Sequence, residues 1–159
     1  MISVPLTSLA VDPPLWSANW AWSLPLIVLT VIIHVLGLGL INRKITRVSS
    51  SVEQRRYPNI AFVLIMAATT LAATILHGAE AAIWAAAYRL LGALPDQRSA
   101  MLYSLNAITS YGHANISLES HWQLMGAMEA LNGWLLFGLT TAFLFAMIEK
   151  VGSLMGNET

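Results

Sequence analysis

Cysteine is absent from the chain, which excludes disulfides and thiolate metal sites but does not identify a redox compartment. Charged residues are scarce: they make up 10% of the 159 residues, whereas soluble domains hold roughly a quarter. The formal net charge is zero, so nothing suggests a nucleic-acid partner. With 57% hydrophobic residues and a mean hydropathy of +0.65, the chain has the composition of a protein embedded in a lipid bilayer.

Sequence motifs of catalysis are missing as well. The chain has no HExxH pattern, no close group of cysteine and histidine, and no nucleophile next to a base. We therefore expect neither an enzyme nor a protein with a resident metal or organic cofactor. A membrane enzyme or a haem carrier is disfavoured among the possible function classes.

Three apolar segments are long enough to cross a bilayer, which takes about 20 residues. The first, residues 23–42, follows an arm of residues 1–22 whose tryptophans are typical of the membrane interface. Residues 43–57 are rich in basic side chains, namely Arg43, Lys44, Arg47, Arg55 and Arg56. Since positive loops stay in the cytoplasm, we expect a multi-pass protein of the cell (inner) membrane with its N-terminus outside and its C-terminus in the cytoplasm.

The second long segment begins at Pro58, which suits the first turn of a helix, and runs to about Leu91. Asp96 or Ser99 then caps a short helix that extends to about Ala107. At about ten residues this helix is too short to cross a bilayer, so we expect it to be re-entrant.

A polar, non-helical segment is expected at residues 106–113, between the short helix and a last span at residues 121–148. Irregular backbone exposed to lipid leaves amide groups unpaired, at a cost of several kcal/mol each. The segment must therefore be enclosed by protein or line a water-filled cavity. We predict that it lines a pore near the outer face of the membrane, because the basic segment before the second span lies inside.

The sequence Ile-Thr-Ser-Tyr-Gly-His at residues 108–113 resembles the filter sequence Thr-Val-Gly-Tyr-Gly-Asp of the tetrameric potassium-channel superfamily, specifically of its small bacterial members. Gly133 and the run at residues 137–142 lie at the distance expected for the inner helix of that family. The resemblance covers residues 58–150 as a pore-loop channel-like domain. It leaves out the arm, the extra first span, the basic loop and a tail of residues 151–159.

The resemblance implies an all-α integral membrane protein with three transmembrane helices, a re-entrant pore helix and a filter-like loop. It also implies a homotetramer around one central cation pore. Carbonyl groups of such a filter replace the hydration shell of an ion, so monovalent cations such as K⁺ are the expected ligands. The implied filter residues are Ile108, Thr109, Ser110, Tyr111, Gly112 and His113.

The filter-like segment departs from the family pattern at several positions. Ser110 stands at the first glycine, Ile108 replaces the threonine, and His113 replaces the acid at the mouth. Two functions therefore remain open. One is a conducting cation channel, and the other is a non-conducting subunit of the same fold with a structural or accessory role beside other membrane subunits.

One helical stripe of the last span carries mainly aromatic side chains at helical spacing. Its members are Trp134, Phe137, Thr141, Phe145 and Ile148. The resemblance turns this stripe toward the central axis, so we expect it to line the pore or to form its gate; packing against other helices is the alternative. Gly133 and Gly138 would permit either a hinge or close helix contacts.

An acid within a span is costly and needs a partner. Glu80 could act as a filter support by accepting hydrogen bonds from the pore loop, or it could pair locally with His77 or Arg89. Glu129 poses the same question, with His121 or a neighbouring subunit as the partner.

His34 and His77 lie on neighbouring spans and raise the question of a bis-histidine haem. Counted from the expected cytoplasmic ends of the two spans, His34 lies about 12 Å deep and His77 about 28 Å deep. We therefore expect a separate, hydrogen-bonded structural role for each histidine rather than a shared group.

Overall fold

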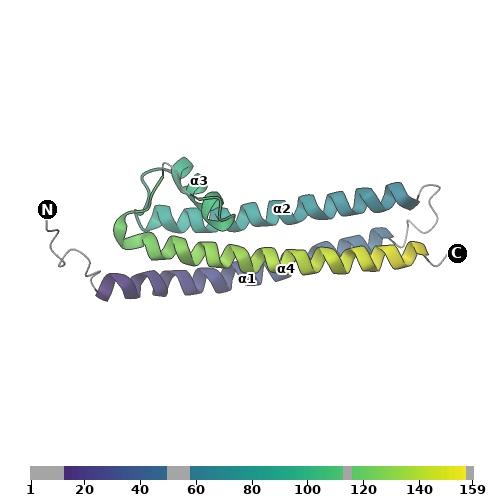
Figure 1. The fold of residues 1–159 in the computed structure, drawn as a ribbon, viewed down its shortest axis with the longest axis horizontal. Helices are drawn as coiled ribbons and strands as arrows, with labels where there is room; N and C mark the ends of the chain where they lie inside the picture. The colour runs from purple at the N-terminus through teal and green to yellow at the C-terminus, as the bar shows by residue number, and fades with distance from the viewer. Residues whose placement is uncertain (1–12, 50–57, 113–115, 157–159) are drawn as a thin grey trace, which may run out of the picture.

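The computed structural model describes residues 13–49, 58–112 and 116–156, and every regular element in these ranges is a helix. Three long helices run side by side, and a short helix packs across one end of the bundle (Figure 1). The long helices are α1 (Pro13–Ser49), α2 (Pro58–Leu90) and α4 (Gln123–Gly156). The short elements are α3 (Gln97–Ile108) and a 3-10 turn, η2 (Ser120–Trp122). All three long helices are long and apolar enough to cross a membrane, as the sequence predicts.

Helix α1 begins at Pro13 and ends at Ser49, well beyond the residues 23–42 expected from hydropathy. The paired prolines start the helix rather than break it, because the first turn needs no backbone N–H from them. At the other end lysine and arginine are good helix formers, so the helix continues through much of the basic segment. The expected arm and loop are therefore partly helical, and residues 1–12 and 50–57 lie outside the described part of the chain.

Helix α2 has nearly the predicted bounds and is continuous through Gly78. It ends at Leu90 and is followed by a turn in which Gly92 has a left-handed φ of 68°, which suits glycine. The N–H of Ala93 then donates to the Tyr88 carbonyl at 2.9 Å. The Arg89 guanidinium donates to the carbonyl of Leu94 at 2.6 Å. Arg89 thus stabilises the turn after α2 and does not serve as the partner of Glu80.

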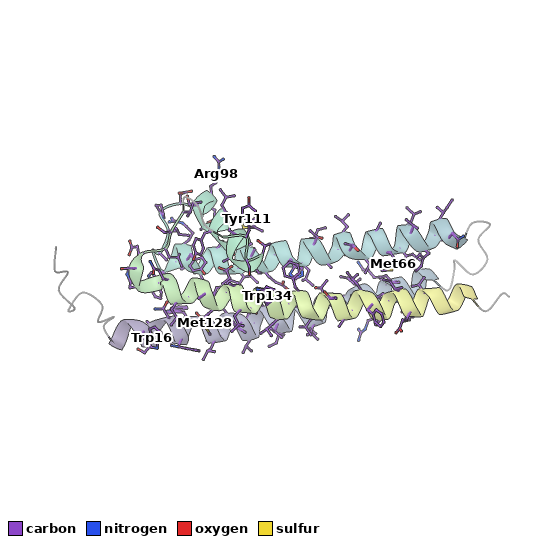
Figure 2. The ribbon with its side chains drawn as sticks, viewed as in Figure 1. Trp16, Met66, Arg98, Tyr111, Met128 and Trp134 are labelled. Carbon is purple, nitrogen blue, oxygen red and sulfur yellow. The ribbon has the colours of Figure 1, made fainter. Side chains whose placement is uncertain are left out.

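Asp96 is the N-cap of α3, which resolves the predicted choice between Asp96 and Ser99. Its carboxylate accepts hydrogen bonds from the hydroxyl of Ser99 at 2.7 Å and from the backbone N–H of Ser99 at 2.9 Å. These bonds, the one from the hydroxyl first, lower the pKa of Asp96 below its ordinary value. Arg98, in the first turn, points away from the bundle (Figure 2).

Helix α3 continues to Ile108, so the prediction that the polar segment is non-helical from Asn106 onward is wrong for its first residues. The helix ends in a Schellman motif: the N–H of Ser110 donates to the Ala107 carbonyl, and the N–H of Tyr111 donates to the Asn106 carbonyl, each at 2.9 Å. Ser110 adopts the left-handed φ of 54° that the motif requires, a conformation that costs a non-glycine residue roughly 1–2 kcal/mol. A helix cap therefore stands where we expected an extended filter segment.

Aromatic side chains pack α3 against both of its neighbours. Trp84 and Tyr88 of α2, Tyr103 and Ala107 of α3, and Met125 of α4 form one buried core. The rings of Tyr88 and Tyr103 meet edge to face, with centroids 5.3 Å apart, an arrangement that adds about 0.5–1.5 kcal/mol to their burial. This core holds the middle and the end of α3, and with them the direction in which the helix runs along the bundle.

Helix α1, which lies outside the family resemblance, is joined to α4 by directional polar contacts. The Asn19 amide donates to the carbonyl of His121 at 2.6 Å and accepts from the N–H of Met125 at 2.9 Å. Farther along, the Asn132 amide donates to the Thr30 hydroxyl at 2.8 Å. Since these three side chains are buried, α1 is an integral part of the bundle.

Gly133 is the closest approach between α4 and α3. A Cβ at Gly133 would collide with the carbonyl oxygen of Ile108, whereas a Cβ at Gly138 would have nothing within 4 Å. The two glycines, for which we expected either a hinge or close helix contacts, therefore differ: Gly133 makes a close contact with α3, and Gly138 has open space around it.

We predict that Gly133→Ala lowers the free energy of unfolding by about 1–3 kcal/mol, the usual cost of overpacking a close contact. Unfolding of the purified chain in mixed micelles, followed by circular dichroism, measures this change. Gly138→Ala is the matched control and should be neutral or stabilising by up to about 1 kcal/mol, because alanine favours the helix. Equal destabilisation by the two variants would show that the Ile108 contact is unimportant.

Candidate functional site

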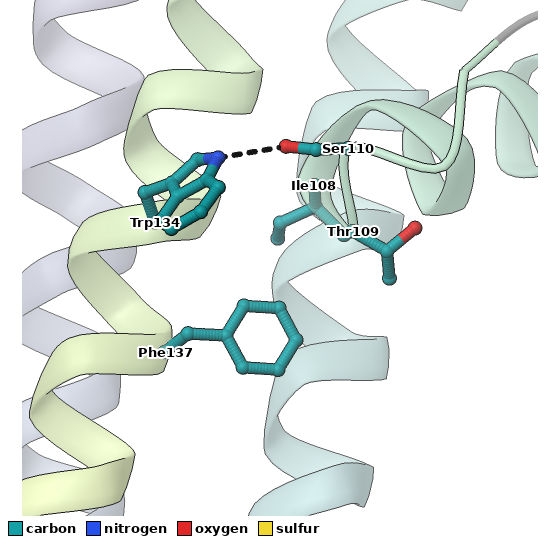
Figure 3. Close-up of a pocket in the computed structure, with 5 residues that line it drawn as sticks. All are labelled: Ile108, Thr109, Ser110, Trp134 and Phe137. Atoms are coloured by element: carbon teal, nitrogen blue, oxygen red, sulfur yellow. Dashed lines mark hydrogen bonds between the residues drawn. The ribbon is translucent and has the colours of Figure 1, made fainter.

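The residues expected to form the filter and the stripe meet at a pocket of about 190 Å³. Ile108, Thr109 and Ser110 line it from the end of α3, and Trp134 and Phe137 line it from α4 (Figure 3). The indole N–H of Trp134 donates to the hydroxyl of Ser110 at 2.9 Å. This bond ties the turn after α3 to α4 within an otherwise largely apolar pocket.

The other residues of the filter-like segment have different surroundings. The Thr109 hydroxyl donates to the carbonyl of Leu105 in its own helix, at 2.6 Å. Tyr111 is 85% exposed, and Gly112 has a left-handed φ of 95°. His113 lies outside the described residues. Among residues 108–112, the structure thus shows the end of a helix and the turn that caps it.

The stripe on α4 is exposed along its length. Trp134 is 71% exposed and Phe145 is 62% exposed, and Phe137, Thr141 and Ile148 are exposed as well. Only the first part of the stripe reaches the pocket, because Phe145 follows Phe137 by about 12 Å of helix. The stripe therefore does not form the core of a single chain, and packing within the chain does not explain it.

A closed ring of four polar side chains lies beside Phe137, and three of them, His34, Glu80 and Thr140, are buried. The Nδ1 atom of His34 is 2.8 Å from Glu80 Oε1, and the Nε2 atoms of His34 and His77 each lie 3.0 Å from the Thr140 hydroxyl. The Nδ1 atom of His77 is 3.4 Å from Glu80 Oε2, which closes the ring. His34 and Glu80 are fully buried. We call the three residues that could ligate a metal the His34–His77–Glu80 cluster.

The prediction that His34 and His77 lie at different depths is wrong, because their ring centroids are 5.0 Å apart. The error came from the helix end. With α1 extended to Ser49, His34 lies about 15 residues from the end of its helix. His77 lies about 19 residues from the start of α2 at Pro58. The remaining offset is only about 6 Å at helical rise, which the loop and the helix tilt absorb.

Glu80 does not support the filter-like segment, contrary to one of the two roles expected for it. Its hydrogen-bond partner is His34 of α1, which we had not considered, and its second oxygen faces His77. The local alternative, pairing with His77, is thus closer to the arrangement than bracing of the turn.

Glu129 is the carboxyl group that holds α3 in place. The Tyr88 hydroxyl of α2 donates to Glu129 Oε2 at 2.7 Å, and Ser104 of α3 contacts Glu129 Oε1. Within the chain its partners are therefore Tyr88 and Ser104 rather than His121. The sequence does not identify Tyr88 and Ser104 as the partners of Glu129, because the role of a hydroxyl in a helix depends on which helix packs against it.

A protonated, neutral Glu129 accounts for the contacts of this group. The Ser104 hydroxyl lies 2.6 Å from the Ala81 carbonyl and also contacts Glu129 Oε1. Because a hydroxyl has one proton, a protonated Glu129 can donate to Ser104 while Ser104 donates to Ala81. With Tyr88 donating to the other oxygen, every polar atom of the group is satisfied when Glu129 is a neutral acid. A neutral acid also avoids the cost of burying an unpaired charge.

The chain matches no protein-family model, no curated protein and no solved structure. The structure alone therefore indicates what kind of protein this is. The described residues form a helical bundle with three helices long and apolar enough to cross a membrane, and with a fourth, short helix packed against one end.

We predict that Glu129→Gln stays within about 1 kcal/mol of the parent chain in unfolding free energy, because an amide accepts from Tyr88 and donates to Ser104 as the neutral acid does. Glu129→Ala should lose about 1–3 kcal/mol for each buried group left unpaired. Unfolding in mixed micelles measures both.

Glu149→Gln and Glu149→Ala are the controls for these changes, since Glu149 is exposed; both should stay within about 0.5 kcal/mol. If Glu129→Gln were as destabilising as Glu129→Ala, Glu129 would be a carboxylate rather than a neutral acid.

Proposed function

We propose that the chain is a subunit of a potassium-channel-like homotetramer that forms a central pathway for monovalent cations across the cell membrane. The observation that carries the proposal is the pocket shared by the end of α3 and the exposed stripe of α4. In this arrangement Ser110, Trp134 and Phe137 lie near the axis, and Phe145 and Ile148 lie toward the cytoplasmic end.

A re-entrant α3 is supported by how far the helix reaches along the bundle. Ile108 packs in one cluster with Ala81 of α2 and Leu136 of α4. Ala81 lies about 14 Å along the helix from the end of α2 at Leu90, near which α3 begins. The chain then returns to the same end of the bundle, where α4 starts at Gln123. A segment that enters and leaves a bundle at one end has the path of a pore helix and its loop.

The proposed orientation puts this end outside the cell. Trp16, Trp20 and Trp22 are exposed in the first turns of α1. The start of α1 lies at the same end of the bundle as α3 (Figure 1), where an interface is expected to hold tryptophan. The opposite end carries the exposed side chains of Arg43 and Lys44. Their charge favours the cytoplasm for that end.

Electrostatics favour a cation at the end of α3. The C-terminus of a helix carries roughly half a negative charge, which stabilises cations within about one turn. The end of α3, Ile108, borders the pocket. Four such helix ends directed toward one axis would add their fields in a water-filled space, where no single chain can enclose an ion.

Assembly is favoured by the cost of leaving this surface in lipid. Tyr111 and the turn around it are exposed, and irregular backbone in hydrocarbon loses several kcal/mol for each unpaired group. Symmetric copies packed along the α4 stripe would cover the turn. Other membrane subunits could cover it as well, but four identical copies account for the proposed central pathway without a further partner.

One observation favours the second candidate, a non-conducting subunit with a structural or accessory role. The Schellman motif makes Ile108 and Thr109 the end of a helix instead of an extended segment. The pocket beyond them is lined by Trp134 and Phe137. A conducting filter needs free carbonyl oxygens in place of water. Conduction therefore requires the turn to change conformation on assembly.

We predict four copies of the chain per particle in nanodiscs, measured by native mass spectrometry. Trp134→Ala should shift the particles toward smaller assemblies, because it removes a large side chain from the proposed axis. Leu64→Ala is the matched control, since Leu64 is similarly exposed on α2 at 61% and should leave the assembly intact. A monomer, dimer or trimer of the parent chain would overturn the tetramer.

We predict that Phe145→Ala raises basal K⁺ flux in proteoliposomes. A ring of phenyl groups would dehydrate a passing ion without replacing its water, at a cost of several kcal/mol. Phe143→Ala is the control: Phe143 packs against the cluster of Ala61, Ile65, Met147 and Val151 and should not raise flux.

If Phe145→Ala stays silent while Ser110→Gly combined with Ile108→Thr produces flux, the block lies at the end of α3 rather than at Phe145. If no variant conducts, the accessory subunit is the correct function.

A further inference from the structure

The His34–His77–Glu80 cluster has the composition of a metal site. We propose that it binds one divalent first-row transition ion of the Zn²⁺ type through two imidazoles and one carboxylate. One ligand atom from each residue can be chosen so that all three lie within 4.8 Å of one another. His34 comes from α1, and His77 and Glu80 come from α2, so an ion here would join these helices.

The Nε2 atoms of both histidines face Thr140, which leaves their Nδ1 atoms as the possible metal ligands. Both Nε2 atoms lie 3.0 Å from the Thr140 hydroxyl of α4. Without an ion, His34 Nδ1 is hydrogen-bonded to Glu80 Oε1 at 2.8 Å. With an ion bound, the Thr140 oxygen would accept an N–H from each ring, and both Nδ1 atoms would be free to ligate the ion. Metal-binding histidines usually have this arrangement, in which the far N–H is held by an oxygen and the ring orientation is fixed.

Two buried atoms of the cluster lack hydrogen-bond partners. These atoms are Nδ1 of His77 and Oε2 of Glu80. They lie 3.4 Å apart, beyond the usual 2.7–3.2 Å of an N–H···O bond. The same spacing suits two ligands of one tetrahedral ion, since bonds of about 2.0–2.1 Å put neighbouring ligand atoms roughly 3.4 Å apart. Glu80 is fully buried, so both unpartnered atoms point into the cluster rather than to solvent.

Charge favours a cation at this point. A fully buried carboxylate needs a positive partner. A proton can bridge only one pair of atoms, whereas a metal ion contacts both imidazoles and the carboxylate at once. The donor set selects the class of ion: imidazole suits Zn, Cu, Fe and Ni, whereas Mg²⁺ and Ca²⁺ prefer oxygen ligands.

The test uses the full chain in detergent micelles, stripped with a chelator and exchanged into clean buffer. Zn²⁺ alone is titrated by calorimetry, bound zinc is counted by elemental analysis, and X-ray absorption of the loaded protein reports the ligands. We expect one Zn²⁺ per chain with only nitrogen and oxygen ligands and the scattering pattern of two imidazoles.

Four variants sharpen the assignment, each checked by circular dichroism and gel filtration. Glu80→Gln and His77→Gln keep the side-chain size but remove a ligand and should abolish the one-equivalent site. Thr140→Val keeps all three ligands and should weaken affinity about 10–100-fold, as loss of a supporting hydrogen bond does. His121→Gln removes a histidine of η2 outside the cluster and should bind Zn²⁺ as the parent does.

The proposal is overturned if the folded parent chain binds no Zn²⁺. It is also overturned if Glu80→Gln binds as tightly as the parent, or if His121→Gln alone removes the site. If the ligand variants fail to fold, the absorption spectrum of the parent decides: an ion without imidazole ligands excludes the cluster. None of these measurements depends on whether the protein conducts ions.

Discussion

The hydrogen bonds of Glu129 are the constraint on which the position of α3 depends. One buried acid joins Tyr88 of α2 and Ser104 of α3 to α4. Apolar contacts alone would let a 12-residue helix slide or turn, because packing among apolar side chains has little directionality. Since α3 is held at its middle, its end meets α4 at Gly133, and Ser110 comes within reach of Trp134.

Directional hydrogen bonds between buried polar groups also set the register of α1 against its neighbours. Three of its buried polar side chains, Asn19, Thr30 and His34, each meet a polar group on or next to α2 or α4. A shift of α1 by one turn, about 5.4 Å, would break all three contacts at once. An unpaired polar group costs about 1–3 kcal/mol, so these contacts exclude neighbouring registers even though most of the helix is apolar.

The sequence predicts which elements exist better than it predicts how they meet. Composition and hydropathy indicate three long helices and a short one, and the preference for N-cap residues narrows the cap of the short helix to Asp96 or Ser99. The helix ends were harder to predict, because lysine and arginine end the apolar run of α1 although the helix continues through them to Ser49. That error separated His34 from His77 and hid the buried ring. The partners of Glu129 stayed hidden for a related reason: a hydroxyl in a helix reveals nothing until its neighbour is known.

Phe137 links the two parts of the molecule that carry polar chemistry. Its ring stacks on His77 with a centroid distance of 4.7 Å, and it also lines the pocket beside Ser110. Thr140, one turn farther along α4, holds both histidines. A rotation of α4 that moved Phe137 away from the turn would therefore also pull Thr140 from the imidazoles. The buried ring and the end of α3 thus constrain α4 from two sides.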